Sequence, residues 1–177
     1  DFIDSIALDG SHSFVHNNLG NTHYAQKRYQ EAIASYEKAL RFQEDYAQAH
    51  SHLGLCYGLL GKLELAQKHH NTAISIEKNN PQFYYNFALF HQQENDYLQM
   101  EVYLRRALAL SPEDPEIFQQ LGTCMLEQER TIEARSFFSQ GLGFDSSRFD
   151  LMVNLALCAL QDGDSEEARS RLEAVLE

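Results

Sequence analysis

The sequence predicts an all-α protein made of a repeated pair of antiparallel helices, and three observations lead to this fold class. Small residues return every 34 residues, apolar residues within each interval follow helical spacing, and turn-forming residues separate two such stretches. Small residues at a fixed period indicate helices that pack closely at the same points in successive units. The three rows are Gly20, Gly54, Ala88, Gly122 and Ala156; Ala32, Ala66, Met100, Ala134 and Ala168; and Ala39, Ala73, Ala107, Gly141 and Val175, in which Met100 and Val175 replace a small residue.

The period divides the chain into a leading segment and five repeats that form one continuous array. The segment 1–12 is expected to be the end of a preceding repeat, and the repeats follow at 13–46, 47–80, 81–114, 115–148 and, truncated, 149–177. Both ends fall inside a repeat, so we expect a fragment of a longer array whose end residues lack a covering neighbour. These residues are Phe2, Ile3, Ile6 and Leu8 at one end and Leu172, Val175 and Leu176 at the other.

Each repeat is expected to hold two helices of about 14 residues. In 47–80, Leu53 and Cys56 belong to the first stripe, Gly61 marks the turn, and Ala66 and Ala73 belong to the second stripe. Helices this short are marginal alone, so stacking must stabilise them.

Two helix starts carry a clear local signal. Asn80 and Asp114 each precede a proline, so they are expected to cap helices that begin at Pro81 and Pro115. Ser111-Pro112 is expected to close the helix before the second of these starts.

Charge limits the class of partner. The formal net charge is −12, and most of the acidic excess lies after residue 88. A negative field repels phosphate backbones, so no nucleic-acid binding is expected and a neutral or basic protein partner is favoured. No run of about 18 apolar residues is present, so no membrane span is predicted.

Three cysteines, Cys56, Cys124 and Cys158, fall at the same place in their repeats, two residues after the first row of small residues. We expect free thiols in the core, because equivalent sites in separate repeats lie too far apart for a disulfide framework. Free thiols favour a reducing compartment, and a cytoplasmic location is expected.

The repeated residues resemble those of the tetratricopeptide repeat (TPR) family. The match runs through Leu19-Gly20, Ala32, Tyr36 and Ala39, through Leu53-Gly54, Tyr57, Ala66 and Ala73, through Tyr84, Phe87-Ala88, Ala107 and Pro112, and through Phe118, Leu121-Gly122, Ala134, Phe138, Leu155-Ala156 and Ala168. The family's tryptophan is absent, and His16 and His50 stand in its place in two repeats. The resemblance implies a right-handed α-solenoid whose first helices line a concave groove that binds extended protein segments.

The groove of the TPR family is lined by the position two before the first small residue. Here that row is Asn18, His52, Asn86, Gln120 and Asn154, and each side chain can donate and accept a hydrogen bond. Such an amide ladder suits the backbone of an extended neutral or basic peptide. Neighbouring candidates for the same groove are Asn21, Tyr24, Leu55, Tyr85 and Leu89. The alternative is that these asparagines serve packing between helices.

TPR domains that hold a C-terminal carboxylate use Lys and Arg at groove positions, and the corresponding places here carry none. They hold Asn17, Asn21, His52, Gln82 and Asn86. The carboxylate-clamp interpretation is therefore rejected.

No catalytic, cofactor or metal site is expected. His16, His23, His50 and His91 fall at aromatic core places of the repeat, and the adjacent pair His69-His70 points to different faces of a helix. The sequence thus favours a non-catalytic adaptor or scaffold. Two alternatives stay open: a structural spacer that self-associates end to end through its uncovered ends, and a substrate-recruiting array of a larger enzyme.

Overall fold

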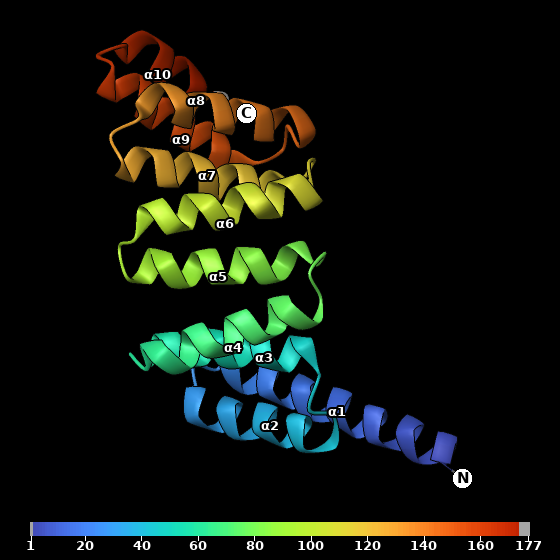
Figure 1. The fold of residues 1–177 in the computed structure, drawn as a ribbon. Coiled ribbons are helices and arrows are strands. Elements are labelled where there is room, and N and C mark those ends of the chain that lie inside the picture. Colours follow the sequence, from blue (N-terminus) through green and yellow to red (C-terminus); the bar gives the residue numbers. More distant parts are fainter. Residues whose placement is uncertain (1, 174–177) are drawn as a thin grey trace. The chain divides into compact units, whose positions relative to one another are not determined.

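The structure is a computed structural model that describes the backbone of residues 2–173 and the side chains of residues 11–173. Within these residues it contains ten α-helices and no strand, which confirms the all-α class of helix–turn–helix repeats (Figure 1). The helices are α1 (Phe2–Ala25), α2 (Tyr29–Phe42), α3 (Ala47–Leu59), α4 (Leu63–Ile76), α5 (Pro81–Gln93), α6 (Tyr97–Leu110), α7 (Pro115–Glu127), α8 (Thr131–Phe144), α9 (Phe149–Gln161) and α10 (Ser165–Glu173).

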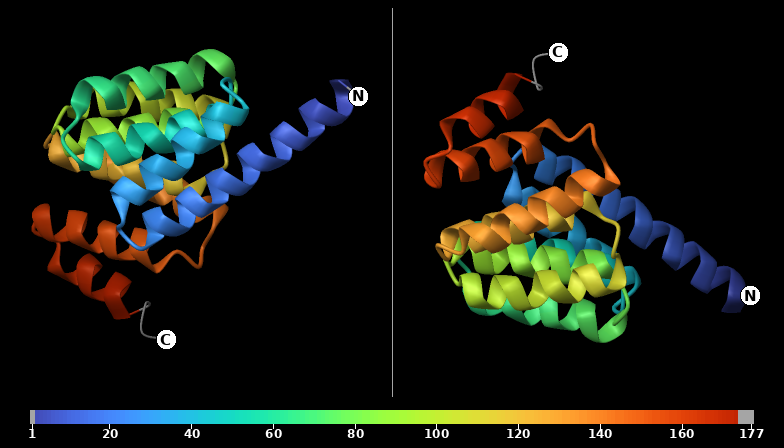
Figure 2. Two further views of the ribbon diagram at one scale, coloured as in Figure 1. Left: turned by 90° about the horizontal axis from the view of Figure 1, so that it is seen from below. Right: turned by 90° about the horizontal axis from the view of Figure 1, so that it is seen from above.

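The chain divides into two compact units. Unit 1 contains α1–α5 and unit 2 contains α6–α10, so the division falls inside the predicted repeat 81–114. In unit 1, α1 packs on α2 and α3 on α4, whereas in unit 2, α7 packs on α8 and α9 on α10 (Figure 2). Second helices also contact the next first helix, as α2 contacts α3, α4 contacts α5, α6 contacts α7 and α8 contacts α9.

The turn that follows each first helix has the same backbone conformation throughout the chain. One residue has a positive φ in each, and these are Lys27 (58°), Gly61 (69°), Asn95 (57°), Glu129 (60°) and Gly163 (82°). The next N–H donates to a carbonyl in the last turn of the helix, as Lys62 N does to Tyr57 O at 2.8 Å. This Schellman closure ends the helix. Two of the five residues are glycines, so composition alone indicates the turn at Gly61 and Gly163.

Both predicted caps are confirmed. Asn80 Oδ1 accepts a hydrogen bond from the backbone N–H of Gln82 at 3.1 Å. Asp114 Oδ1 accepts one from the backbone N–H of Glu116 at 3.0 Å. Each cap satisfies a donor that the first turn of the helix leaves unpaired.

The first row of small residues makes room for a ring from the second helix of the same pair. A Cβ atom at Gly54 would lie 2.6 Å from His70 Nε2, which is closer than atoms normally approach. The same relation joins Gly20 to Tyr36 and Gly122 to Phe138. Glycine at these places therefore lets the two helices approach with the ring between them.

The three cysteines are free and buried, as predicted. Burial raises the pKa of the Cys56 thiol to about 12, and burial also raises the pKa values of Cys124 and Cys158. The thiols are therefore protonated at neutral pH and contribute as small apolar groups.

The backbone differs from the sequence-based expectation at residues 1–12. The repeat register predicts the end of a preceding repeat there, whereas α1 runs without a break from Phe2 to Ala25. The segment contains no proline, and Gly10 alone is too weak a helix breaker to end α1. Of the residues expected to be uncovered at the ends, Leu172 is 40% exposed. The side chains of Phe2, Ile3, Ile6, Leu8, Val175 and Leu176 lie outside the described residues.

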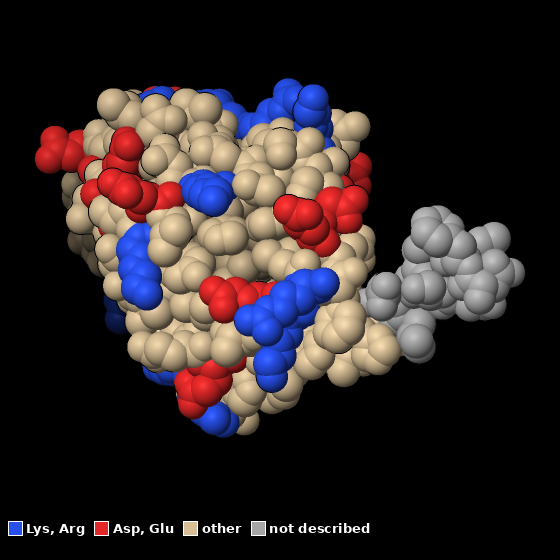
Figure 3. All heavy atoms as spheres, turned by 60° about the horizontal axis from the view of Figure 1, so that its bottom comes forward, with Lys and Arg blue, Asp and Glu red and all other residues tan. Residues whose placement is uncertain are grey.

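Two further features of the described residues concern helix length and surface charge. No helix within residues 2–173 is long and apolar enough to cross a membrane. On the face shown in Figure 3, acidic and basic side chains are interspersed among wide areas of other residues.

Candidate functional site

Three consecutive first helices of unit 1 line a cavity of about 270 Å³. We call it the α1–α3–α5 cavity, and Tyr36 of α2 completes its wall. None of the lining residues carries a charged side chain at neutral pH. The lining residues are Asn21, Tyr24, Tyr36, His52, Leu55, Gln82 and Asn86.

Tyr36 fixes the orientation of Asn21 at one side of the cavity. The Tyr36 hydroxyl donates a hydrogen bond to Asn21 Oδ1 at 2.8 Å. Burial raises the pKa of Tyr36 far above its ordinary value, so the hydroxyl keeps the proton that it donates. Among the described residues, the amide nitrogen of Asn21 has no partner, so two N–H donors remain for a ligand.

His52 contributes a hydrogen-bond acceptor. Its Nδ1 lies 3.1 Å from Asn17 Oδ1, and the centroid of its ring lies 5.2 Å from the centroid of the Tyr36 ring. Burial lowers the pKa of His52 to about 4, so the ring is neutral at pH 7. A neutral ring whose Nδ1–H donates to Asn17 has a lone pair on Nε2, and that atom has no other hydrogen-bond partner in the described structure.

Asn86 is a structural link between α3 and α5. It is buried, its Nδ2 donates to Ser51 Oγ at 2.9 Å, and its Oδ1 accepts from Gln82 Nε2 at 2.9 Å. The residue 35 positions earlier is the partner here, as Asn17 is for His52. The Asn86 amide thus fits the alternative that these asparagines serve packing between helices. Gln82 lies beside Asn86 in the cavity.

The cavity brings together half of the residues predicted for the groove: Asn21, Tyr24, His52, Leu55 and Asn86. Tyr85 and Leu89 lie half-buried on α5 outside the cavity lining. Asn18 is exposed and also lies outside the cavity lining. Gln120 on α7 and Asn154 on α9 are half-buried in unit 2, where no described residue pairs with either side-chain amide.

Sequence reasoning missed two lining residues. Tyr36 matches an aromatic position of the repeat and is 1% exposed, yet its hydroxyl reaches the cavity through Asn21. In the sequence, Gln82 stands only among the positions that correspond to a carboxylate clamp. The sequence does hold a signal for Gln82, which lies one helical turn before the row member Asn86. Tyr36 lies on α2, the helix next to α1 and α3.

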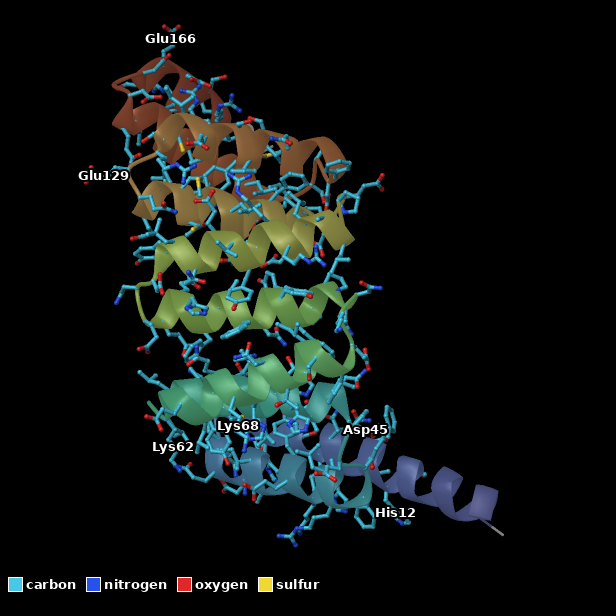
Figure 4. The ribbon with its side chains drawn as sticks, viewed as in Figure 1. His12, Asp45, Lys62, Lys68, Glu129 and Glu166 are labelled. Atoms are coloured by element: carbon cyan, nitrogen blue, oxygen red, sulfur yellow. The ribbon has the colours of Figure 1, made fainter. Side chains whose placement is uncertain are left out.

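A second polar cavity lies beside α3 and α4 and contains a close histidine pair. The Nδ1 atoms of His50 and His69 are 2.9 Å apart, and His50 Nε2 lies 3.0 Å from the carbonyl oxygen of Glu44. Asp45 and Lys68, labelled in Figure 4, also line this cavity. Within the described residues, no group of three or more His, Cys, Asp or Glu side chains is arranged to hold a metal ion.

The histidines expected in the core differ in burial. His91 is buried, whereas His16, His23 and His50 are half-buried. His70, which belongs to the second helix of its repeat, is fully buried. Packing rather than ligand binding accounts for His70, because its ring stacks on Phe87 with centroids 4.9 Å apart.

Sequence models of tetratricopeptide repeats match more than half of the chain. A model described as TPR repeat matches residues 20–61. A model described as Tetratricopeptide repeat matches residues 47–80 and 81–114.

Curated relatives match nearly the whole chain at low identity. Human protein O-mannosyl-transferase TMTC3 is 21% identical over 182 residues, which cover 94% of this chain and 20% of the relative. The TPR repeat-containing protein YpiA of Bacillus subtilis is 24% identical over 171 residues, covering 96% of this chain and 40% of YpiA. The chain thus spans less than half the length of either relative.

Solved structures share the fold. Pseudomonas aeruginosa pilF matches with a TM-score of 0.86 at 19% identity, over 95% of this chain and 77% of that chain. MamA from Desulfovibrio magneticus RS-1 matches with a TM-score of 0.77 at 14% identity, over 94% of each chain. YrrB, described as a TPR protein with an unusual peptide-binding site, matches with a TM-score of 0.69 at 22% identity, over 99% of this chain and 91% of that chain.

Proposed function

We propose a protein-binding function from the premise that the chain belongs to the tetratricopeptide repeat family. Tetratricopeptide repeats generally mediate protein–protein interaction. Our proposal is that this chain is a non-catalytic adaptor whose unit 1 binds an extended peptide segment of a partner protein. One uncharged side chain of that segment occupies the α1–α3–α5 cavity. The three buried free cysteines support a reducing compartment such as the cytoplasm.

The observation that carries this proposal is the chemistry of the cavity lining. Tyr24 and Leu55 supply apolar surface, Asn21 supplies N–H donors, and His52 supplies an acceptor. A peptide unit offers one C=O and one N–H, which these two polar groups complement. A charged side chain would lose its hydration there without gaining an ion partner. The cavity therefore favours a neutral residue.

Two further predicted residues extend the proposed surface within unit 1, where Tyr85 and Leu89 would contact the segment along α5. In unit 2, taken by itself, Gln120 and Asn154 would offer the same amide chemistry. Basic residues flanking the neutral anchor are favoured, because the chain carries a net charge of −12. The likeness to YrrB, itself described as having a peptide-binding site, supports peptide recognition on this fold.

A peptide-display screen on this chain, followed by fluorescence anisotropy with labelled hits, tests the proposal. Leu55→Ala removes apolar surface from the cavity, and Asn21→Ala removes the donor pair. Each variant is expected to weaken binding about tenfold, the loss of about 1.4 kcal/mol. The screen is expected to return segments with an uncharged anchor residue.

Two variants on α4 serve as matched controls. Leu65→Ala and Asn71→Ala change the same residue types at exposed positions outside the cavity, so binding should be unchanged. If cavity and control variants bind hits equally well, peptide recognition does not use the α1–α3–α5 cavity. If the screen returns no hit above background, the peptide-binding proposal fails.

A second candidate is a substrate-recruiting array within a larger enzyme. The match to human O-mannosyl-transferase TMTC3, of which the chain spans 20%, favours this reading. In that case, deleting these repeats from the intact protein would lower transfer to a protein acceptor and leave transfer to a short peptide acceptor unchanged. Equal loss on both acceptors would point to a structural role instead.

A further inference from the structure

The wall of the α1–α3–α5 cavity carries three open hydrogen-bonding groups whose polarity is set by their other partners. Asn21 Oδ1 accepts from the Tyr36 hydroxyl, so Asn21 Nδ2 offers two N–H donors. His52 Nδ1 donates to Asn17 Oδ1, so Nε2 of the neutral ring offers a lone pair. Gln82 Nε2 donates to a neighbour on α5, and in the described structure Gln82 Oε1 has no partner. The wall thus offers one donor group and two acceptors.

The donor group and the histidine acceptor both lie beside Tyr36. The hydroxyl of Tyr36 is 2.8 Å from Asn21 Oδ1, and its ring centroid is 5.2 Å from that of His52. On each helix an apolar side chain follows the polar one after three positions, Tyr24 after Asn21 on α1 and Leu55 after His52 on α3. Residues three apart on a helix are neighbours. The cavity therefore places apolar surface one helical turn from its polar groups, as an aliphatic stem with a polar end requires.

Charged side chains do not match this wall. A carboxylate only accepts hydrogen bonds, so it would place its lone pairs against those of His52 and Gln82. Burial lowers the pKa of His52 to about 4, so at neutral pH the ring supplies no positive charge to a carboxylate. An ammonium or guanidinium group only donates, so it has no acceptor for the N–H groups of Asn21. No charged residue lines the cavity to offset the lost hydration.

The neutral groups of a peptide differ in their number of donors. A hydroxyl brings one O–H, and a trans peptide unit brings one N–H that points away from its C=O. Either group leaves one of the two acceptors of the wall unpaired. A primary carboxamide brings two N–H donors and a carbonyl oxygen with two lone pairs, all at one end of a side chain. Its inventory is complementary to that of Asn21, His52 and Gln82.

We propose that the α1–α3–α5 cavity is a subsite for the side-chain carboxamide of a glutamine or asparagine in the bound segment, an inference that rests on the proposed peptide-binding function. The carboxamide oxygen accepts from Asn21 Nδ2. One N–H donates to His52 Nε2 and the other to Gln82 Oε1. The aliphatic stem of the anchor lies against Tyr24 and Leu55.

A double-mutant cycle identifies the peptide residue that enters the cavity. Each residue of the tightest peptide from the display screen is replaced by alanine, and fluorescence anisotropy measures binding to the parent and to Leu55→Ala. The residue in contact with Leu55 is the one whose replacement weakens binding to the parent more than binding to Leu55→Ala. Peptides with glutamine, asparagine, methionine, glutamate or lysine at that position are then compared. A peptide in which no residue couples to Leu55 would overturn the subsite.

The glutamine or asparagine peptide is expected to bind the parent about tenfold more tightly than the methionine peptide, because methionine leaves the polar groups of the wall unpaired. The glutamate peptide is expected to bind more weakly than the glutamine peptide. If methionine binds as tightly as glutamine and asparagine, the carboxamide subsite is overturned, whereas peptide binding through the cavity stands. A screen that returns no peptide would overturn both.

Asn21→Asp tests the polarity of the hydrogen bonds with little change of shape. The new carboxylate still accepts from the Tyr36 hydroxyl, but it presents an oxygen where the parent presents N–H donors. The preference for glutamine over methionine is expected to disappear, and the lysine peptide should bind more tightly than it binds the parent. Asn71→Asp, exposed on α4 outside the cavity, adds the same charge and should keep the glutamine preference. A glutamine preference that survives Asn21→Asp would overturn the proposal.

Discussion

The imidazole of His70, on α4, lies against Gly54, on α3, and fills the space that a side chain at Gly54 would need. His70 is fully buried, and within the described part of the chain neither of its ring nitrogens has a hydrogen-bond partner. A buried polar group without a partner loses its hydration and gains nothing in return. The buried His70 ring therefore lowers the free energy of unfolding relative to an apolar ring in the same place.

Replacing His70 with Phe is expected to stabilise the protein by about 1–3 kcal/mol, because it removes two unpaired buried polar atoms. Tyr36 and Phe138 already fill the corresponding space against Gly20 and Gly122, so a six-membered ring fits. Urea unfolding at neutral pH measures the change. The reverse substitution, Phe138→His, should lower stability, and a less stable His70→Phe variant would contradict the prediction.

The same histidine makes stability depend on pH. Burial lowers the pKa of His70 to about 3 from an ordinary value of 6.5. The unfolded state binds the proton more readily, so the contribution of His70 is fully present above pH 6.5 and is lost as the pH falls toward 3. In this window the parent is expected to lose stability faster than His70→Phe, by up to about 1.4 kcal/mol per pH unit.

Urea unfolding of both proteins across that window is the measurement. His52 and His69, each with a pKa lowered to about 4 mainly by burial, titrate in both proteins and cancel in the comparison. Equal slopes for the parent and His70→Phe would show that His70 does not titrate as described.

Gly54→Ala should destabilise the protein by about 1–3 kcal/mol, because the new Cβ forces the His70 ring out of place. Gly143→Ala is the matched control, since no atom lies within 4 Å of the site of its Cβ. Alanine is a better helix residue than glycine, so the control should gain about 0.5–1 kcal/mol. Thermal unfolding measures both variants. If their melting temperatures shifted in the same direction, the packing argument would be refuted.

Asn86→Ala should lower stability by about 1–3 kcal/mol, because it leaves Ser51 and Gln82 without their partner. Asn154→Ala should change stability little, since its amide has no partner among the described residues. Urea unfolding compares the two variants. Loss of peptide binding in Asn86→Ala therefore needs a stability measurement for comparison. The same holds for Asn21→Ala, which leaves the buried Tyr36 hydroxyl without its acceptor.

The helical pairs could be predicted because their signals are local. Periodic glycines and alanines and the caps at Asn80 and Asp114 each act within a single pair of helices. The turns at Lys27, Asn95 and Glu129 carry no glycine signal in the sequence, because the Schellman closure places a non-glycine residue at a positive φ in each. The uninterrupted α1 also differs from the expectation, because the repeat register suggests a break between helices that no residue in 1–12 enforces.

The repeat, its helix-packing residues and the polar row follow from the sequence, since these depend on spacing within one chain. The role of each row member depends on the folded structure. Asn86 and His52 occupy equivalent positions, yet one amide is held on both sides and the other ring keeps a free acceptor. Asn18, at the same position, stays exposed. These roles differ because a side chain's remaining hydrogen-bonding capacity depends on its neighbours from the adjacent repeat, which spacing alone does not specify.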